Sequence, residues 1–98
     1  MNPFAPSTLA ALAQEFGTPL WVYDAATITR QIQALKQFDV VRFAQKANSN
    51  THILRLMKSL GVAVDSVSLG EVERALAAGF NPGLQVIDGV GHAEIVFT

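Results

Sequence analysis

The sequence contains no cysteine, so it can form neither a disulfide framework nor a thiolate metal site. Charged residues are also few, at 15% of the chain, and seven basic against eight acidic side chains give a formal net charge of −1. We therefore expect no nucleic-acid partner and no membrane partner, because both attract clusters of Lys and Arg. No apolar run approaches the length of about 20 residues that a membrane-spanning helix needs. The N-terminus lacks the charged segment of a signal peptide, and we expect a cytoplasmic protein.

Apolar residues make up 50% of the 98 positions, a proportion typical of chains that fold around a hydrophobic core. This length suits one small domain and is short for most two-domain enzymes. Two regions are expected: residues 1–24, with a helix and a first strand, and residues 25–98, with alternating strands and helices.

In the first region, Ser7 is expected to cap a helix that Gly17 ends. The segment at 18–24, TPLWVYD, is rich in β-branched and aromatic residues and predicts a strand. Asp24 then caps a helix that carries apolar residues at helical spacing, namely Ile28, Ile32 and Leu35.

The second region continues with a strand predicted over 39–47, DVVRFAQKA, with Lys46 at its C-terminal end. Alternation places Lys46 on one face with Val40, Arg42 and Ala44, and places Val41, Phe43 and Gln45 on the other. A helix over 51–60 follows, capped by Ser49 or Asn50 and ended by Gly61.

A strand is predicted over 62–69, and Ser68 with Glu71 forms a capping box for the helix that follows and ends at Gly79. Residues 80–93 are expected to form a loop, and EIVFT at the C-terminus to begin another strand. Strands that alternate with helices through short connections favour a parallel sheet. The expected fold class is therefore α/β, an incomplete (β/α)₈ barrel represented by its first βα units, because such a barrel takes about 250 residues.

Four motifs in order resemble the diaminopimelate decarboxylases, which are pyridoxal-phosphate enzymes of the alanine racemase-like barrel fold and belong with the ornithine, lysine and arginine decarboxylases of class II. The motifs are FGTPLWVYD, VVRFAQKANSN, GVAVDSVSLGEVERALAAGF and IVFT. The resemblance implies decarboxylation of meso-diaminopimelate to L-lysine, with pyridoxal 5'-phosphate as cofactor, in an enzyme that is a homodimer. It also implies that residues 1–24 adjoin a second, β-rich domain.

By the same resemblance, Lys46 forms the Schiff base with the cofactor, Ala44 lines the cofactor ring, and Asp65 approaches the lysine end of the cofactor. The residues that follow Lys46, at 48–50, are expected to cap a helix and not to touch substrate. The chain lacks the family's later histidine and phosphate-binding glycine loops, so this piece alone is expected to be inactive.

Two other functions stay open: a non-catalytic truncated product, and a related pyridoxal-phosphate barrel enzyme such as an arginine or ornithine decarboxylase or a racemase. Arg42 is expected to form a buried ion pair away from the cofactor. His52 and His92 have no partner at metal-ligand spacing, so no metal site is expected.

Overall fold

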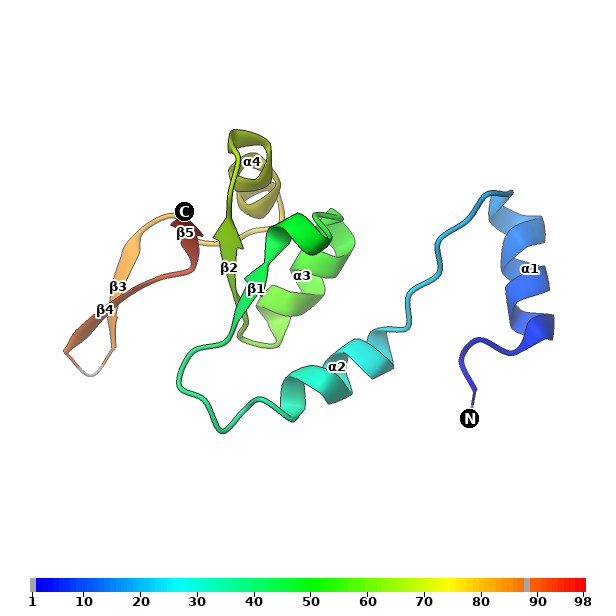
Figure 1. Cartoon of the computed structure of the whole chain (residues 1–98), viewed down its shortest axis with the longest axis horizontal. Coiled ribbons are helices and arrows are strands. Elements are labelled where there is room, and N and C mark those ends of the chain that lie inside the picture. Colours follow the sequence, from blue (N-terminus) through cyan, green and yellow to red (C-terminus); the bar gives the residue numbers. More distant parts are fainter. Residues whose placement is uncertain (1, 88) are drawn as a thin grey trace.

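The computed structural model describes residues 2–87 and 89–98, which form an elongated chain with extents of 51 × 30 × 18 Å (Figure 1). Its helices are α1 (Pro6–Phe16), α2 (Ala25–Gln33), α3 (Thr51–Ser59) and α4 (Leu69–Ala77), with a short 3₁₀ turn, η1 (Gln45–Ala47). Its strands are β1 (Arg42–Ala44), β2 (Ala63–Ser66), β3 (Leu84–Ile87), β4 (Val90–Ala93) and β5 (Ile95–Phe97). No helix within the described ranges is long and apolar enough to cross a membrane.

The central sheet has the order β1–β2–β5, and both pairs of neighbouring strands are parallel. In its register, Ala44 lies opposite Asp65, and Asp65 lies opposite Val96. Parallel neighbours need a crossover connection, and α3 and α4 occupy the two connections. The predicted order of strand, helix, strand, helix and strand is therefore confirmed.

The core lies on one face of this sheet, which we call the covered face. Its buried hydrophobic residues are Ile32, Leu54, Met57, Val62, Val64, Ala75, Ala78 and Phe80. Phe43 and Ile95, which neighbour Val64 in the register, pack against this cluster. The opposite face, with Ala44 and Asp65, is the open face, because the alternation of a strand sends neighbouring side chains to opposite sides.

Short polar side chains begin three of the helices as predicted. Asp24 accepts a hydrogen bond from Thr27 N at the start of α2, and Asn50, not Ser49, caps α3 by accepting from His52 N. At α4, Ser68 Oγ accepts from Glu71 N, which confirms the cap, and Glu71 Oε1 accepts from Val67 N, so the return bond of the capping box goes to the residue before the cap. Glycines with positive φ follow α1, α3 and α4, at positions 17, 61 and 79.

The N-terminal part of the chain differs from the prediction in two ways. Helix α1 begins after Ala5, with Pro6 in its first turn, so Ser7 lies inside the helix and does not cap it. Residues 18–24 form no strand: the chain bends at residues 18 and 19, and no described segment pairs with the residues that follow. Figure 1 shows this segment connecting α1 to α2 at a distance from the sheet.

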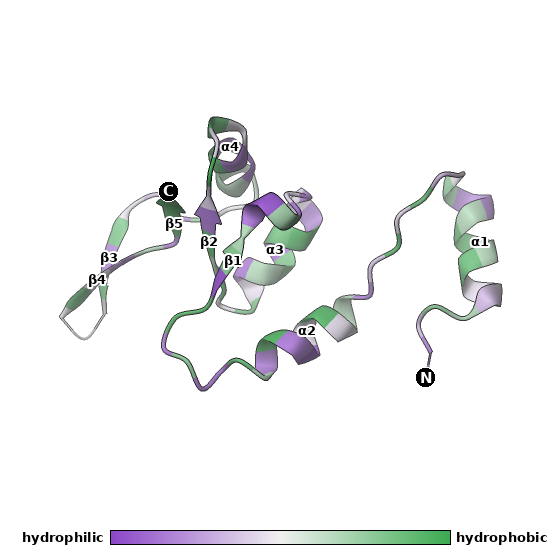
Figure 2. Cartoon of the chain, in the orientation of Figure 1, coloured by the Kyte–Doolittle hydropathy of each residue, from purple (hydrophilic) through white to green (hydrophobic). Residues whose placement is uncertain are grey.

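This uncovered segment exposes large apolar side chains. Trp21 is 86% exposed and Tyr23 is 53% exposed, so the two do not pack together in a core. A shallow hollow beside them is lined by Leu12, Phe16, Leu20, Trp21, Val22 and Tyr23. Figure 2 shows hydrophobic residues on α1 and along this connection, where no other element covers them.

The predicted loop over 80–93 is wrong from residue 84 onward, where β3 and β4 form an antiparallel hairpin. Leu84 pairs with Ala93, and Ile87 pairs with Val90. The sequence carries a hairpin signal there, because Asp-Gly between β-branched residues is typical of a tight turn. The hairpin extends away from the sheet on the side opposite α1 (Figure 1).

Candidate functional site

The C-terminal edge of the sheet gathers the residues that the sequence singled out. Parallel strands end at the same edge, so the ends of β1, β2 and β5 lie next to one another. Ala44 ends β1 directly opposite Asp65 of β2, and both lie on the open face. Thr98, which follows β5, donates from Oγ1 to Asp65 Oδ1 at 2.8 Å. Ala44 is exposed and Asp65 is half-buried, so this edge is accessible.

The prediction that Lys46 ends a strand is wrong. Strand β1 stops at Ala44, and the next three residues form the 3₁₀ turn η1. The strand is thus shorter than the predicted range of 39–47, and strand alternation does not place Lys46. Its side chain is exposed and makes no hydrogen bond or ion pair with any other residue in the described ranges. Lys46 therefore lies at the expected edge, on a turn two residues after Ala44.

Gln45 is the buried residue of η1. Its side chain is fully buried and accepts a hydrogen bond from Ser66 Oγ at 2.7 Å. It also donates from Nε2 to the carbonyl oxygen of Glu71, at 2.6 Å, in the first turn of α4. One side chain thus joins the end of β1, the end of β2 and the start of α4.

The residues after η1 serve local structure. Asn48 Oδ1 accepts from Asn50 N, and Ser49 Oγ donates to the carbonyl oxygen of Gln45 at 3.1 Å. Asn50 accepts from two backbone N–H groups at the start of α3. The prediction that these residues cap a helix is confirmed for Asn50.

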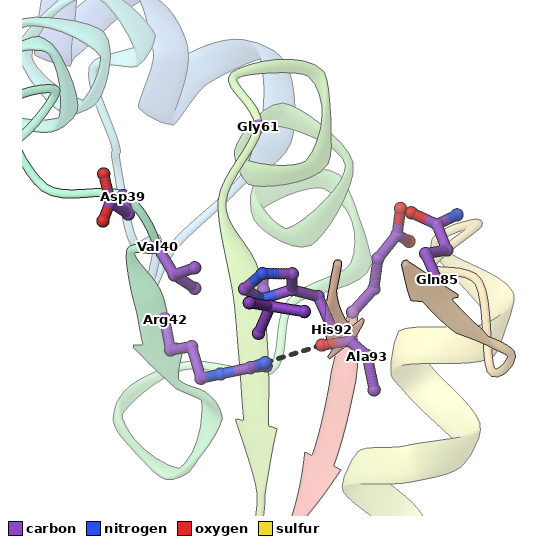
Figure 3. Close-up of a pocket in the computed structure, with 10 residues that line it drawn as sticks. Asp39, Val40, Arg42, Gly61, Gln85, His92 and Ala93 are labelled. Carbon is purple, nitrogen blue, oxygen red and sulfur yellow. Dashed lines mark hydrogen bonds between the residues drawn. The ribbon is translucent and has the colours of Figure 1, made fainter. Parts of the chain in front are cut away.

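A pocket of about 560 Å³ lies at the other end of the strands (Figure 3). Asp39, Val40 and Arg42 line it from β1 and the segment before it, and Gln85, His92 and Ala93 line it from the hairpin. None of the three proposed site residues, at 44, 46 and 65, lines this pocket. It is therefore not the site that the sequence predicts.

Arg42 crosses this pocket, and Figure 3 shows its guanidinium directed at Ala93. It donates to the carbonyl oxygen of Ala93 at 2.7 Å and to that of Val64 at 3.3 Å. The predicted ion pair of Arg42 is wrong, because backbone carbonyl groups accept its hydrogen bonds and no carboxylate does so in the described part of the chain. Arg42 instead fastens the end of the hairpin to the central strand.

The charge pair on the covered side joins α3 to the start of β5. Lys58 Nζ lies 3.1 Å from Glu94 Oε2, and Asn81 N also donates to Glu94. Partial burial raises the pKa of Glu94, but the hydrogen bond from Asn81 and the Lys58 ammonium outweigh it, so the pKa lies below its ordinary value. Within the described ranges, no three or more His, Asp and Glu residues are grouped as metal ligands.

Comparison with known protein families places this geometry in a biochemical context. Residues 25–90 match the model of the family described as "Pyridoxal-dependent decarboxylase, pyridoxal binding domain". This chain belongs to the pyridoxal-dependent decarboxylase family. The matched range includes β1, η1 and β2, and therefore all three predicted site residues.

Relatives within the pyridoxal-dependent decarboxylases are similar over most of the chain. Diaminopimelate decarboxylase of Escherichia coli (strain K12) is 67% identical over 88 residues, which are 90% of this chain and 21% of the relative. The Streptomyces coelicolor enzyme of the same name is 68% identical over 76% of this chain and 17% of its own length. The chain thus spans about a fifth of the length of these curated relatives.

Solved structures agree with the sequence comparison. A crystal structure of diaminopimelate decarboxylase matches 84% of this chain with a TM-score of 0.77 at 65% identity, over 21% of that chain. A protein from Aquifex aeolicus matches 91% with a TM-score of 0.73 at 37% identity. The expected fold class is confirmed: the open parallel sheet corresponds to part of a pyridoxal-phosphate-binding (β/α)₈ barrel.

The residues at the C-terminal edge fit the family's cofactor, pyridoxal phosphate. A covalent bond to an aldehyde cofactor needs a lysine amine that is accessible, and the exposed Lys46 provides one. Ala44 has a small side chain beside it, and Asp65 supplies a carboxylate on the neighbouring strand. In barrels of this kind, functional residues lie at the C-terminal ends of the strands, which is where these three residues lie.

Sequence reasoning missed Gln45 and Ser66. One signal was present: Gln45 falls on the same face of the predicted strand as Val41 and Phe43, and a polar residue in an apolar row needs a buried partner. The partner, Ser66, lies 21 positions away and can be found only once the register of β1 and β2 is known.

Proposed function

We propose that this sequence is part of a pyridoxal-phosphate-dependent carboxy-lyase that converts meso-diaminopimelate to L-lysine and carbon dioxide, a step of lysine biosynthesis. The observation that carries the proposal is the exposed Lys46 on η1, at the C-terminal edge of a parallel sheet, in a chain of this family. The names of the similar enzymes support the choice of substrate.

In this proposal, Lys46 holds the cofactor through a covalent bond to Nζ. Ala44 leaves space for the cofactor ring, because a larger side chain at this position would project onto the open face beside Asp65. Asp65 orients the lysine end of the cofactor, and Thr98 fixes one carboxylate oxygen of Asp65 by its hydrogen bond.

Pyridoxal phosphate, when bound, supplies an electron sink for the pair of electrons that stays on the substrate after carbon dioxide leaves. The contribution of this chain would be to hold the cofactor through Lys46 and to free that lysine when the substrate amine takes its place. The freed Lys46, or a nearby acid, would then move a proton.

The open face also supports the expectation that residues 1–98 are inactive alone. Lys46 has no partner within the described ranges, and nothing described covers Ala44. We propose that the enzyme is a cytoplasmic homodimer, that its small-molecule substrate binds over the open face, and that neither nucleic acid nor membrane takes part. We further propose the division at 1–24 and 25–98, since residues 18–24 join no part of the described sheet.

The test is a carbon dioxide release assay on the full-length polypeptide that contains this sequence, with meso-diaminopimelate, arginine and ornithine offered separately. Activity on meso-diaminopimelate is expected, and Lys46→Ala should lower kcat by about 1,000-fold or more, because both the covalent bond and the proton transfer are lost. Lys36→Ala is the matched control, because Lys36 is an exposed lysine that donates to the carbonyl oxygen of Leu60, which precedes β2 at the end of the strands opposite η1.

Three results would contradict the proposal. Preference for arginine or ornithine would assign a related decarboxylase, and interconversion of stereoisomers without loss of carbon dioxide would assign a racemase. Full activity of Lys46→Ala would show that Lys46 does not bind the cofactor covalently.

A further inference from the structure

The covered face of the sheet contains a buried polar pair. Gln45 and Ser66 are the two polar residues that are fully buried within the described ranges, each at 0% exposure. They bond to each other at 2.7 Å, and Gln45 reaches the backbone of Glu71 at 2.6 Å. Val64, two residues before Ser66 on the same face of β2, is also fully buried and belongs to the hydrophobic core. A buried amide whose hydrogen bonds are satisfied has one favoured orientation, because its partners fix where its nitrogen and oxygen lie.

One member of this pair, Gln45, belongs to the turn η1 that also carries Lys46. Gln45 precedes Lys46, and its backbone oxygen accepts from Asn48 N at 3.0 Å and from Ser49 Oγ at 3.1 Å, which closes η1. The strand ends at Ala44, so no ladder hydrogen bond determines where the residues of η1 lie. The anchored side chain of Gln45 therefore determines the position of the turn.

We propose that the buried Gln45–Ser66 pair positions Lys46 for its covalent bond to pyridoxal phosphate, so that Gln45 and Ser66 are positioning residues which do not touch the cofactor. The inference rests on the function proposed above. It depends on contacts of the covered face, all of which lie within the described residues, and not on what lies over the open face. The amide ties η1 to both β2 and α4, so loss of the pair leaves the turn free to shift.

The alternative is that the pair only stabilises the fold. Two variants separate the roles. Gln45→Met/Ser66→Ala removes both hydrogen-bonding side chains together, so neither member of the pair is left buried without the other, and only the carbonyl oxygen of Glu71 loses a donor. Replacing both partners of a buried hydrogen bond costs less stability than removing one. Val64→Ala creates a cavity in the fully buried center of β2 and lowers stability without altering the polar pair.

The experiment uses the full-length polypeptide, incubated with pyridoxal phosphate at a one-to-one ratio and reduced with borohydride. Mass spectrometry measures the pyridoxyl label on Lys46 relative to Lys36 and Lys58. Gln45→Met/Ser66→Ala should lower the relative label on Lys46 about 10-fold, because a small misplacement of a reacting group has a large effect on rate. Val64→Ala should leave this ratio unchanged although its melting temperature falls.

Steady-state kinetics give a second measure. The double variant should lower kcat about 10-fold with KM changed by less than about two-fold, because the defect lies in the group that reacts and not in substrate binding. Ser66→Ala alone, which keeps Gln45 and its bond to Glu71, should show a smaller change in the same direction. It also provides the measurement if the double variant does not fold.

The inference is overturned if the double variant and Ser66→Ala label Lys46 as the unmodified protein does, or if Val64→Ala lowers the ratio equally. In both cases the proposed function would stand. If the unmodified protein itself carries no preferential label on Lys46, the proposed function and the positioning role are overturned together.

Discussion

The two faces of the central sheet differ in how their polar groups are satisfied. On the covered face, no buried side-chain nitrogen or oxygen of the described residues lacks a hydrogen-bond partner, and Gln45 and Ser66 satisfy each other. On the open face, Ala44 is exposed, and on the turn that follows it the amine of Lys46 has no partner in the described part of the chain. We propose that the exposed amine serves the chemistry and that the buried pair fixes its position.

The largest effect on stability should come from the covered face. Leu54 is fully buried in α3, so Leu54→Ala should lower the free energy of unfolding by about 2–5 kcal/mol through the cavity it leaves. Leu84→Ala is the matched control in the hairpin, where the side chain is 72% exposed, and its effect should stay within about 0.5 kcal/mol. Urea unfolding of the full-length polypeptide measures both variants. Equal losses would show that the covered face is not the core of the folded chain.

A smaller effect is expected at the start of α4, which the buried pair joins to the sheet. Ser68→Ala removes the hydroxyl that accepts from Glu71 N, and should lower the free energy of unfolding by about 1 kcal/mol. Ser59→Ala is the control, because Ser59 is exposed at the end of α3 and its hydroxyl donates to a carbonyl of the same helix. A Ser68→Ala variant as stable as the unmodified protein would remove the capping box from this account.

The smallest effect should come from the ion pair of Lys58 and Glu94, whose side chains are 37% and 28% exposed. The pKa of Glu94 is lowered in the folded chain, so its contribution to stability is present above its ordinary value of 4.5 and is lost as the pH falls through the lowered value. Because both side chains are partly exposed to solvent, which screens the pair, this contribution should be about 0.5 kcal/mol or less. Glu94→Gln should reduce, by that amount, the fall in the free energy of unfolding as the pH drops below about 4.5. Loss of stability on raising the pH through the same range would contradict the assigned sign.

The covered face was largely predictable from the sequence, because helical spacing and capping residues are local signals. Asn50, Ser68 and Gly61 mark the ends of helices where the structure has them. The first predicted strand, at 18–24, failed because β-propensity gives a strand only where a partner strand exists, and no described segment pairs there.

The site was predictable in part. The motif around Lys46 singled out this lysine, and the structure has it at the C-terminal edge of the sheet, but strand alternation extended β1 too far, to residue 47. The turn η1 replaces the end of that strand because Gln45 is held by Ser66 and Glu71, which are distant in sequence. The hairpin of β3 and β4 was missed because the glycines and proline of 80–93 were interpreted as a loop, although Val86 and Val90 flank a turn sequence.

The most direct test of the account asks which lysine carries the cofactor. The full-length polypeptide is reduced with borohydride in the presence of pyridoxal phosphate, and peptide mass spectrometry locates the label, with Lys46→Ala as the control. The account predicts a label on Lys46 and no comparable label on Lys36 or Lys58. Before reduction, the unmodified protein should show the visible absorbance band of the bound cofactor, and Lys46→Ala should lack it. A label spread over the three lysines, or a total label unchanged in Lys46→Ala, would contradict the assignment of the C-terminal edge of the sheet as the cofactor site.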